Sequence, residues 1–161
     1  MTENRVCCFT GHRDFDRVAT EQEKLIFRTI TNNVIRMGYT TFMSGGALGF
    51  DMAAAEYILW LKAQGLGLRL VMVLPCADQT SRWNVYQKRR HDAICRAADE
   101  IVCLHDRYVG GCMHERNRYM VDNSSACIAY CGRDSGGTAY TLQYAKKRER
   151  MVFNVHAMAR M

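Results

Sequence analysis

The sequence lacks the features that place a protein in a membrane or carry it across one. No apolar run approaches the roughly 18 residues that a membrane-spanning helix requires. The start of the chain, MTENRVCCF, has neither a charged segment followed by a long apolar stretch nor a small-residue cleavage site, so we expect no signal peptide. We therefore expect a cytoplasmic protein with no membrane partner.

The sequence also lacks features that would divide the chain into separate domains. There is no linker-like segment, no low-complexity segment and no tandem repeat. With 161 residues, of which 48% are hydrophobic, the chain has enough apolar material for one globular core and too little for two of similar size. We therefore predict a single domain over residues 1–161.

The cysteines are not arranged as in a disulfide framework or a zinc knuckle. Several of the eight cysteines, Cys7 among them, lie inside apolar runs, where a reduced cysteine packs as a small hydrophobe, so we expect free thiols. Four possible zinc ligands, Cys103, His105, Cys112 and His114, occur close together in the sequence. They include no C-x2-C pair, and two separate pairs would have to be brought together by the fold. We expect no metal and no other cofactor.

Acidic residues are the minority among the charges. Sixteen Asp and Glu face 22 Lys and Arg, which gives a formal net charge of +6. This excess favours a phosphorylated ligand, a nucleic acid or another anionic partner, but it also fits a general role in solubility because the basic residues are dispersed. The one dense basic run, from Lys146 to Arg150, is typical of a solvated helix end.

Short apolar and β-branched runs alternate with longer segments of helical period. The alternation predicts right-handed βαβ crossovers and an α/β fold: a Rossmann-like, doubly wound, mainly parallel sheet with helices on both faces. A capping box of Thr20 and Glu23 opens the first helix, and Gly38 follows its end. The predicted strands are Val6 to Phe9, Tyr39 to Met43, Leu68 to Leu74, Ile101 to Leu104, Ala126 to Cys131 and Met151 to Val155. The later predicted helices cover about Met52 to Gln64, Ser81 to Ala98, Met113 to Asn123 and the segment after Ser135.

Three polar clusters fall where predicted strands end: TGHR after the first strand, SGGALGFD after the second and GRDSGGT after the fifth. Ligands of such sheets bind beyond the carboxyl ends of the strands, where helix N-termini and backbone amides converge. Each cluster alone also fits a tight turn with a capping residue. Because three of them share one edge with basic side chains, we favour a nucleotide-type pocket. The predicted ligand-binding residues are Thr10, Gly11, His12, Arg13, Ser44, Gly45, Gly46, Asp51, Arg116, Asn117, Ser135, Gly136, Gly137, Thr138 and Thr141.

A dinucleotide site of the dehydrogenase kind is not indicated. The sequence SGGALGFD is not GxGxxG, and no acidic residue clearly ends the second strand to bind a ribose. In the helix CMHERNRYMVDNSS, Arg116 would lie at the pocket edge with Glu115 able to orient it, and Arg118 could pair with Asp122. Trp83 and Tyr86 fit either stacking on a base or packing in the core, where helical aromatics are found more often.

The motifs resemble those of a known superfamily. MHER with the later SSACIAYCG and SGGTAYTLQYA resembles the pattern MHERK…M…PGGxGTxxE of the LOG phosphoribohydrolases, which release a cytokinin base from its nucleoside monophosphate. SGGALGFDMAAAE and RNRYMVDNSSACI resemble the Rossmann-like core of DNA-processing protein A, which binds single-stranded DNA. From Arg5 to Val155, with CCFTGHR at its start, the chain most resembles the YpsA-type branch of this SLOG superfamily. The resemblance implies a Rossmann-like fold that binds a nucleotide-derived ligand.

The match to the LOG pattern is incomplete at the catalytic position. Arg116 matches the arginine of MHERK and Asn117 replaces its lysine, while Gly136 and Gly137 match the paired glycines. Counting onward places Gln143 at the catalytic glutamate, and a shifted register places Thr141 there.

Neither register supplies the carboxylate that an oxocarbenium-like transition state requires. Hydrolysis in the LOG manner would therefore need Glu115, Asp51 or Asp134 to take that role.

These observations lead to three hypotheses. The first is a protein, without enzymatic activity, that binds or senses a nucleotide or an ADP-ribose-like molecule. The alternatives are an N-glycosidase of the phosphoribohydrolase type, acting on a nucleoside monophosphate, and a single-stranded DNA-binding protein. Against the last, the basic residues form no obvious stripe interleaved with aromatics. By analogy with related folds we also expect a homo-oligomer.

Overall fold

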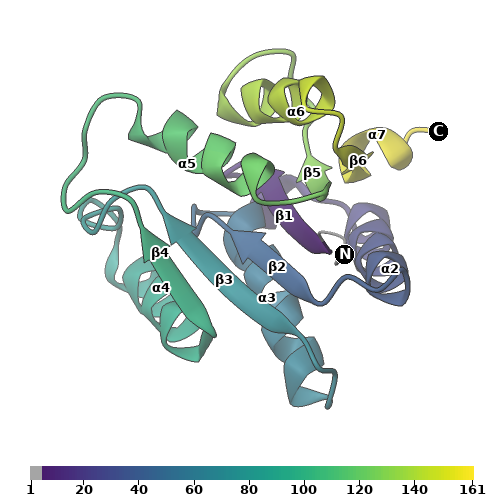
Figure 1. Cartoon of the computed structure of the whole chain (residues 1–161), viewed down its shortest axis with the longest axis horizontal. Coiled ribbons are helices and arrows are strands. Elements are labelled where there is room, and N and C mark those ends of the chain that lie inside the picture. The colour runs from purple at the N-terminus through teal and green to yellow at the C-terminus, as the bar shows by residue number, and fades with distance from the viewer. Residues whose placement is uncertain (1–4) are drawn as a thin grey trace.

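A computed structural model describes residues 5–161, so the first four residues of the predicted domain lie outside the described part. A six-stranded sheet forms the centre, and all of its strand pairs are parallel (Figure 1). The strand order is β4-β3-β2-β1-β5-β6, which confirms the predicted Rossmann-like α/β class. The strands are β1 (Val6–Gly11), β2 (Thr41–Ser44), β3 (Arg69–Leu74), β4 (Glu100–Cys103), β5 (Ala126–Tyr130) and β6 (Met151–Asn154).

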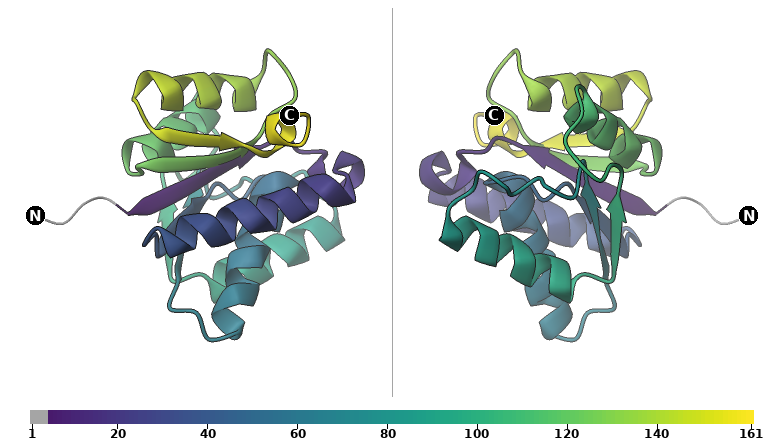
Figure 2. Two further views of the ribbon diagram at one scale, coloured as in Figure 1. Left: turned by 90° about the vertical axis from the view of Figure 1, so that its right-hand side faces the viewer. Right: turned by 90° about the vertical axis from the view of Figure 1, so that its left-hand side faces the viewer.

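Helices cover both faces of the sheet, as Figure 2 shows from its two edges. One face carries α2 (Glu21–Arg36), α3 (Phe50–Ala63) and α4 (Val85–Ala97), and the other carries α5 (Cys112–Asp122) and α6 (Gly137–Lys147). The short α1 (Phe15–Val18) follows β1, and α7 (Val155–Met158) packs against α2 and β5. Within residues 5–161, no helix is long and apolar enough to cross a membrane.

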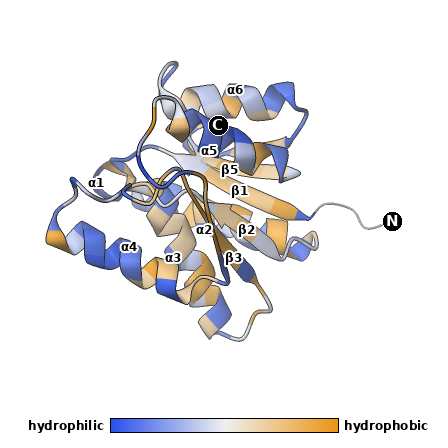
Figure 3. Cartoon of the chain, turned by 60° about the vertical axis from the view of Figure 1, so that its left-hand side comes forward, coloured by the Kyte–Doolittle hydropathy of each residue, from blue (hydrophilic) through white to orange (hydrophobic). Residues whose placement is uncertain are grey.

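The strands are apolar along most of their length because both faces of the sheet are covered (Figure 3). On the α3 side, Phe50 is fully buried at the centre of an aromatic cluster. Its ring centroid lies 5.2 to 6.2 Å from those of Phe9, Phe15, Phe27 and Tyr130. The rings of this cluster come from β1, α1, α2, α3 and β5, so it ties both halves of the sheet to one helical layer.

Several predicted element boundaries differ from the structure by one or more residues, and two of these differences have a clear cause. Helix α4 begins at Val85, not at Ser81, because Asn84 forms a capping box with Gln87 that fixes the start of the helix. Val155 opens α7 and does not extend β6. The reason is Asn154. Its side chain forms hydrogen bonds with the backbone N–H and C=O of Cys131, which would otherwise pair with a further residue of β6. The predicted capping box at the start of α2 is confirmed.

The order of the strands reverses beside β1. From there β2, β3 and β4 follow on one side, and the chain then returns to place β5 and β6 on the other. Gly11 and Tyr130, the last residues of β1 and β5, are neighbours in the register. The segments after these strands lead to α2 and α6 on opposite faces, so a crevice opens between them at the carboxyl edge.

We expect Phe50→Ala to reduce the free energy of unfolding by about 3–5 kcal/mol, because it leaves a cavity within the aromatic cluster. The matched control is Leu25→Ala on α2, where the side chain is 57% exposed and a change of no more than about 0.5 kcal/mol is expected. Urea denaturation followed by circular dichroism measures both variants. Equal effects of the two substitutions would contradict the central role of Phe50.

Candidate functional site

A cleft of about 480 Å³ lies at the point where the strand order reverses. We call it the switch-point cleft. Its volume is in the range of small-molecule sites. Its walls come from the segments after β1 and β5 and from the starts of α3, α5 and α6. The lining residues are Thr10, Gly11, His12, Arg13, Asp14, Ala47, Asp51, Met113, His114, Arg116, Asn117, Arg133, Ser135, Gly136, Gly137 and Thr138.

The long helices differ in how they begin. Away from the cleft, α2 and α4 start with complete capping boxes, at Thr20 and Asn84. At the cleft, α3, α5 and α6 follow Gly49, Gly111 and Gly136, and none of the three has a side-chain cap. An uncapped helix start leaves backbone N–H groups and the positive end of the helix dipole for another partner. At α3 and α5, however, the first N–H groups, those of Phe50 and Cys112, donate to backbone carbonyls, so the start of α6 suits an anion best.

The glycine turn before α6 leaves its backbone accessible. Gly136 has a φ of +101°, a left-handed conformation that favours glycine. Gly137 does not have a left-handed φ. A methyl group added at either glycine would meet no neighbouring protein atom within 4 Å. The turn is thus uncovered on its Cβ side, and both glycines line the cleft.

Arg116 is a buried cation in the wall of the cleft, with 2% of its surface exposed. Its Nε donates to Asn117 Oδ1 at 2.8 Å, and its Nη1 donates to the carbonyl oxygens of Gly45 and Val73. Within residues 5–161 it forms no ion pair, and its Nη2 makes no hydrogen bond. Burial lowers the pKa of Arg116, and the nearby Asp51 raises it. The guanidinium is thus fixed by uncharged oxygens and retains a donor for an anion.

Asp51 is the buried carboxylate of the cleft, with 4% of its surface exposed. Its Oδ2 accepts a hydrogen bond from the backbone N–H of Ala47 at 3.4 Å. Burial raises the pKa of Asp51 to about 6, and the charge of Arg116 limits that rise. A carboxyl with this pKa changes its charge close to neutral pH, which alters the electrostatic potential of the cleft.

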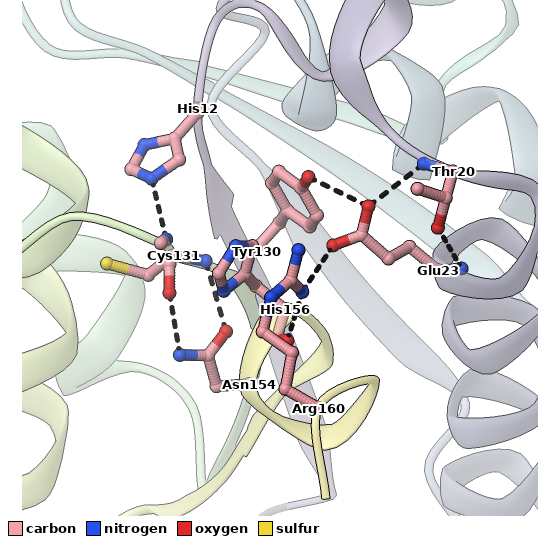
Figure 4. A network of polar contacts seen from close by, with 9 residues as sticks. His12, Thr20, Glu23, Tyr130, Cys131, Asn154, His156 and Arg160 are labelled. Atoms are coloured by element: carbon pink, nitrogen blue, oxygen red, sulfur yellow. Dashed lines mark hydrogen bonds and ion pairs between the residues drawn. The ribbon is translucent and has the colours of Figure 1, made fainter.

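His12 is held as a neutral imidazole at the end of β1. Its Nε2 accepts a hydrogen bond from the backbone N–H of Gly132 at 2.9 Å (Figure 4). An accepting nitrogen carries no proton, so the proton of the neutral ring is on Nδ1. Burial and the charge of Arg133 lower the pKa of His12 and favour this neutral form. His12 therefore presents an uncharged N–H donor in the cleft wall.

A buried polar network supports this end of the sheet (Figure 4). Glu23, which is 1% exposed, accepts from the hydroxyl of Tyr130 at 3.1 Å and pairs with Arg160 at 2.9 Å. Burial alone would raise the pKa of Glu23, but the hydrogen bonds from Thr20, Arg160 and Tyr130 lower it. The network joins α2, β5 and the end of the chain beneath the loop that carries Gly132.

Most of the predicted ligand-binding residues line the switch-point cleft, and the remainder lie behind its wall. The hydroxyl of Ser44 donates to the backbone carbonyl of Asp51, and that of Thr141 donates to the carbonyl of Gly137. Gly45 supplies a carbonyl to Arg116, whose guanidinium occupies the place of a Cβ. The fourth residue behind the wall is Gly46, which has a φ of +70°.

The sequence analysis missed five lining residues: Asp14, Ala47, Met113, His114 and Arg133. Arg133 and Asp14, which both line the cleft, form an ion pair of 2.7 Å. A signal was present, since Arg133 belongs to the motif GRDSGGT and Asp14 directly follows TGHR. Their contact, however, joins residues that are far apart in the sequence.

Other pairings on α5 differ from the prediction. Glu115 pairs with His105 at 2.7 Å and does not orient Arg116. Arg118 donates to the hydroxyl of Tyr140 at 3.2 Å, so the predicted pair with Asp122 was wrong. The neighbouring α6 offers Arg118 this hydroxyl and provides Asp122 with other partners.

The four possible zinc ligands noted in the sequence are not gathered into one site. In the described part of the chain, no three His, Cys, Asp or Glu side chains are placed to hold a metal ion. All eight cysteines are free thiols, as predicted.

The positions that resemble the catalytic residue of LOG lie outside the cleft. Gln143 and Asp134 line a different cavity, of about 570 Å³, beside α6 and α7. Thr141 is fully buried and bonds within its own helix. The carboxylate of Glu115 is hydrogen-bonded to His105. Of the carboxylates considered from the sequence, only Asp51 lines the cleft.

The chain is similar in sequence to curated proteins and in fold to solved structures. The Bacillus subtilis (strain 168) protein described as "Uncharacterized SPbeta prophage-derived protein YoqJ" is 34% identical over 118 residues, covering 66% of this chain and 69% of YoqJ. DNA processing protein A from Streptococcus pneumoniae has a TM-score of 0.62 and 19% identity, covering 92% of this chain. The same protein from Helicobacter pylori, whose structure is described for its single-stranded DNA binding mode, has a TM-score of 0.65 and 20% identity, covering 94%.

The two solved structures establish a shared fold. This chain spans 49% of the Streptococcus protein and 65% of the Helicobacter protein, so each of them contains a large part with no counterpart here. The family model YpsA, described as "YspA SLOG family", matches residues 7–159, which includes every segment that lines the cleft. The chain therefore belongs to the YpsA family of SLOG proteins.

Proposed function

We propose that the chain binds a nucleotide-derived small molecule, such as a nucleotide or ADP-ribose, by its phosphate in the switch-point cleft. The observation that carries the proposal is the open glycine turn before α6, which lines the same cleft as the buried guanidinium of Arg116. Backbone N–H groups at a helix start and a fixed guanidinium are the usual partners of a phosphate.

The charges of the cleft support an anionic ligand. Arg13, Arg116 and Arg133 line it with two carboxylates, Asp14 and Asp51, so the cations are in excess. Arg133 is paired with Asp14, and Asp51 is protonated more readily than an ordinary carboxyl because burial raises its pKa to about 6. The start of α6 adds a further partial positive charge.

Asp51 also supports a second candidate function, cleavage of an N-glycosidic bond in a nucleoside monophosphate. A carboxyl with a pKa of about 6 is suited to general acid or base catalysis near neutral pH. In this case Asp51 would take the role that the catalytic glutamate has in the LOG proteins. Binding without release of free base or ribose phosphate distinguishes a sensor from a hydrolase.

The test is calorimetric titration of AMP, ADP-ribose and ribose 5-phosphate, with adenosine as the ligand that lacks phosphate. A single-stranded oligonucleotide belongs in the same series, because of the fold shared with the Helicobacter protein. The bound samples are then analysed by chromatography for released base. Binding of no phosphate compound would contradict the proposed function.

Gly137→Ala is expected to weaken binding of the phosphate compounds about tenfold, a loss of about 1.4 kcal/mol. The added methyl group is compatible with the fold, and it would extend from a residue that lines the cleft. The matched control is Gly67→Ala, which also adds a methyl group in open space but lies outside the cleft. Equal affinities of the two variants in calorimetry would exclude a phosphate at this turn.

Binding of ADP-ribose is expected to strengthen about fivefold as the pH is lowered from 7.5 to 5, an interaction of about 1 kcal/mol. Asp51 gains its proton as the pH falls through about 6 and then no longer repels the pyrophosphate. Each phosphate of ADP-ribose carries one ester bond and one anhydride bond, so its remaining acidic group does not titrate in this range. His12 becomes more cationic in the same direction, so the comparison with Asp51→Asn isolates the carboxyl. A pH dependence that is unchanged in Asp51→Asn would rule out this role of Asp51.

A further inference from the structure

A second cavity, of about 770 Å³, adjoins the switch-point cleft. We call it the side cavity. It shares Arg13 and Met113 with the cleft, so the two spaces meet at these side chains. Its other lining residues are Leu48, Cys76, Asp78, Gln79, Ser81, Arg82, Trp83, Gln87 and Tyr108.

We propose that the side cavity holds the base of a nucleoside phosphate whose phosphate lies at the start of α6. This inference rests on the proposed function and identifies the ligand class more closely. A phosphate or a sugar phosphate would fill the cleft alone, whereas a nucleoside phosphate would occupy both spaces.

The aromatic side chains in the walls of the side cavity suit the flat face of a base. Trp83 is half-buried, and its ring meets that of His91 edge-on, with centroids 5.4 Å apart and an angle of 84° between the planes. His91 is itself 5% exposed, so it forms a buried support for the indole ring. Tyr108, in the segment between β4 and α5, is 64% exposed and lines the same cavity. Aromatic side chains in such positions bind bases by stacking.

Hydrogen bonds connect the walls of the two spaces. The amide Nε2 of Gln79 donates to the carbonyl of Gly45 at 3.0 Å, which leaves Oε1 of Gln79 to accept from Nε2 of His91 at 3.2 Å. Burial lowers the pKa of His91, and Nδ1 of the neutral ring is then the acceptor for the thiol of Cys95. The same carbonyl of Gly45 accepts from Arg116. His91, which packs against Trp83, is therefore connected to the guanidinium of Arg116 through Gln79 and the carbonyl of Gly45.

The polar groups of the side cavity lie where the edge of a base could bond to them. Gln79 is occupied by Gly45 and His91, and Gln87 by the backbone of Asn84. Asp78 and Ser81 are exposed and line the cavity, so they provide an acceptor and a hydroxyl for the base. Orienting polar groups on an otherwise apolar wall are typical of small-molecule sites.

The fluorescence of Trp83 tests this inference directly. The chain has two tryptophans, and Trp60 is 57% exposed on α3, outside both spaces. Trp60→Phe leaves Trp83 as the only indole. AMP is expected to quench the fluorescence of Trp83, and the affinity from this titration should equal the affinity from calorimetry. Ribose 5-phosphate is expected to bind without quenching.

The two ligands separate failure of this inference from failure of the proposed function. If AMP and ribose 5-phosphate both bind by calorimetry with no change at Trp83, the base lies elsewhere and only the inference fails. If neither compound binds, the proposed function fails and the inference fails with it.

Tyr108→Ala is expected to weaken AMP about tenfold and to leave ribose 5-phosphate unchanged, because only the base would contact the ring. The side chain is exposed, so the substitution should leave the fold intact. The matched control is Tyr86→Ala, since Tyr86 is 80% exposed on α4 and lines neither space. Equal losses for both ligands, or no loss for either, would overturn the assignment of the base to the side cavity.

Discussion

The burial of the Arg116 guanidinium is the constraint on which the rest of the site depends. Removing a charge from water is costly unless other groups compensate it, and the direct partners of Arg116 are uncharged oxygens. This arrangement requires glycine at position 45, because the guanidinium lies where a Cβ would be. It also explains the buried Asp51, whose negative charge stabilises the cation from a distance. An anionic ligand would supply the direct compensation that the protein itself does not provide.

The helix starts differ in a similar way, because some have their first N–H groups hydrogen-bonded by a side-chain cap and others have no such cap. The capping boxes of α2 and α4 satisfy their first N–H groups within the protein, whereas the glycines before α5 and α6 supply no side chain for this purpose. A side-chain cap contributes about 1 kcal/mol to a helix, so its absence at the cleft has a cost in stability. Under the proposed function, a bound phosphate recovers part of that cost, and ligand binding stabilises the fold by mass action.

Sequence reasoning succeeded where the information was local. Alternating apolar runs predicted the strands and helices, and the spacing of Thr20 and Glu23 predicted a helix start that the structure confirms. It failed where contacts join distant segments, as in the ion pair of Arg133 with Asp14. The side cavity was missed for the same reason, since its walls come from four separate stretches of the chain. One of them is the turn before α4, which the sequence analysis had placed inside the helix because the capping role of Asn84 was not recognised.

The geometry of α6 explains why the amide at position 143 bears little on the chemistry of the cleft. The helix starts at Gly137 at the cleft and carries Gln143 into a different cavity, while Thr141 is bonded back to the carbonyl of Gly137. A carboxylate in place of Gln143 would therefore still lie outside the cleft. Any catalytic carboxylate must come from within it, and Asp51 is the buried candidate there. Because Asp51 also compensates Arg116, its ionised form is needed to balance the buried cation, and the same carboxylate repels a phosphate. Under the proposed function these two effects oppose each other in one side chain, so the affinity for a phosphate would depend on whether Asp51 is protonated.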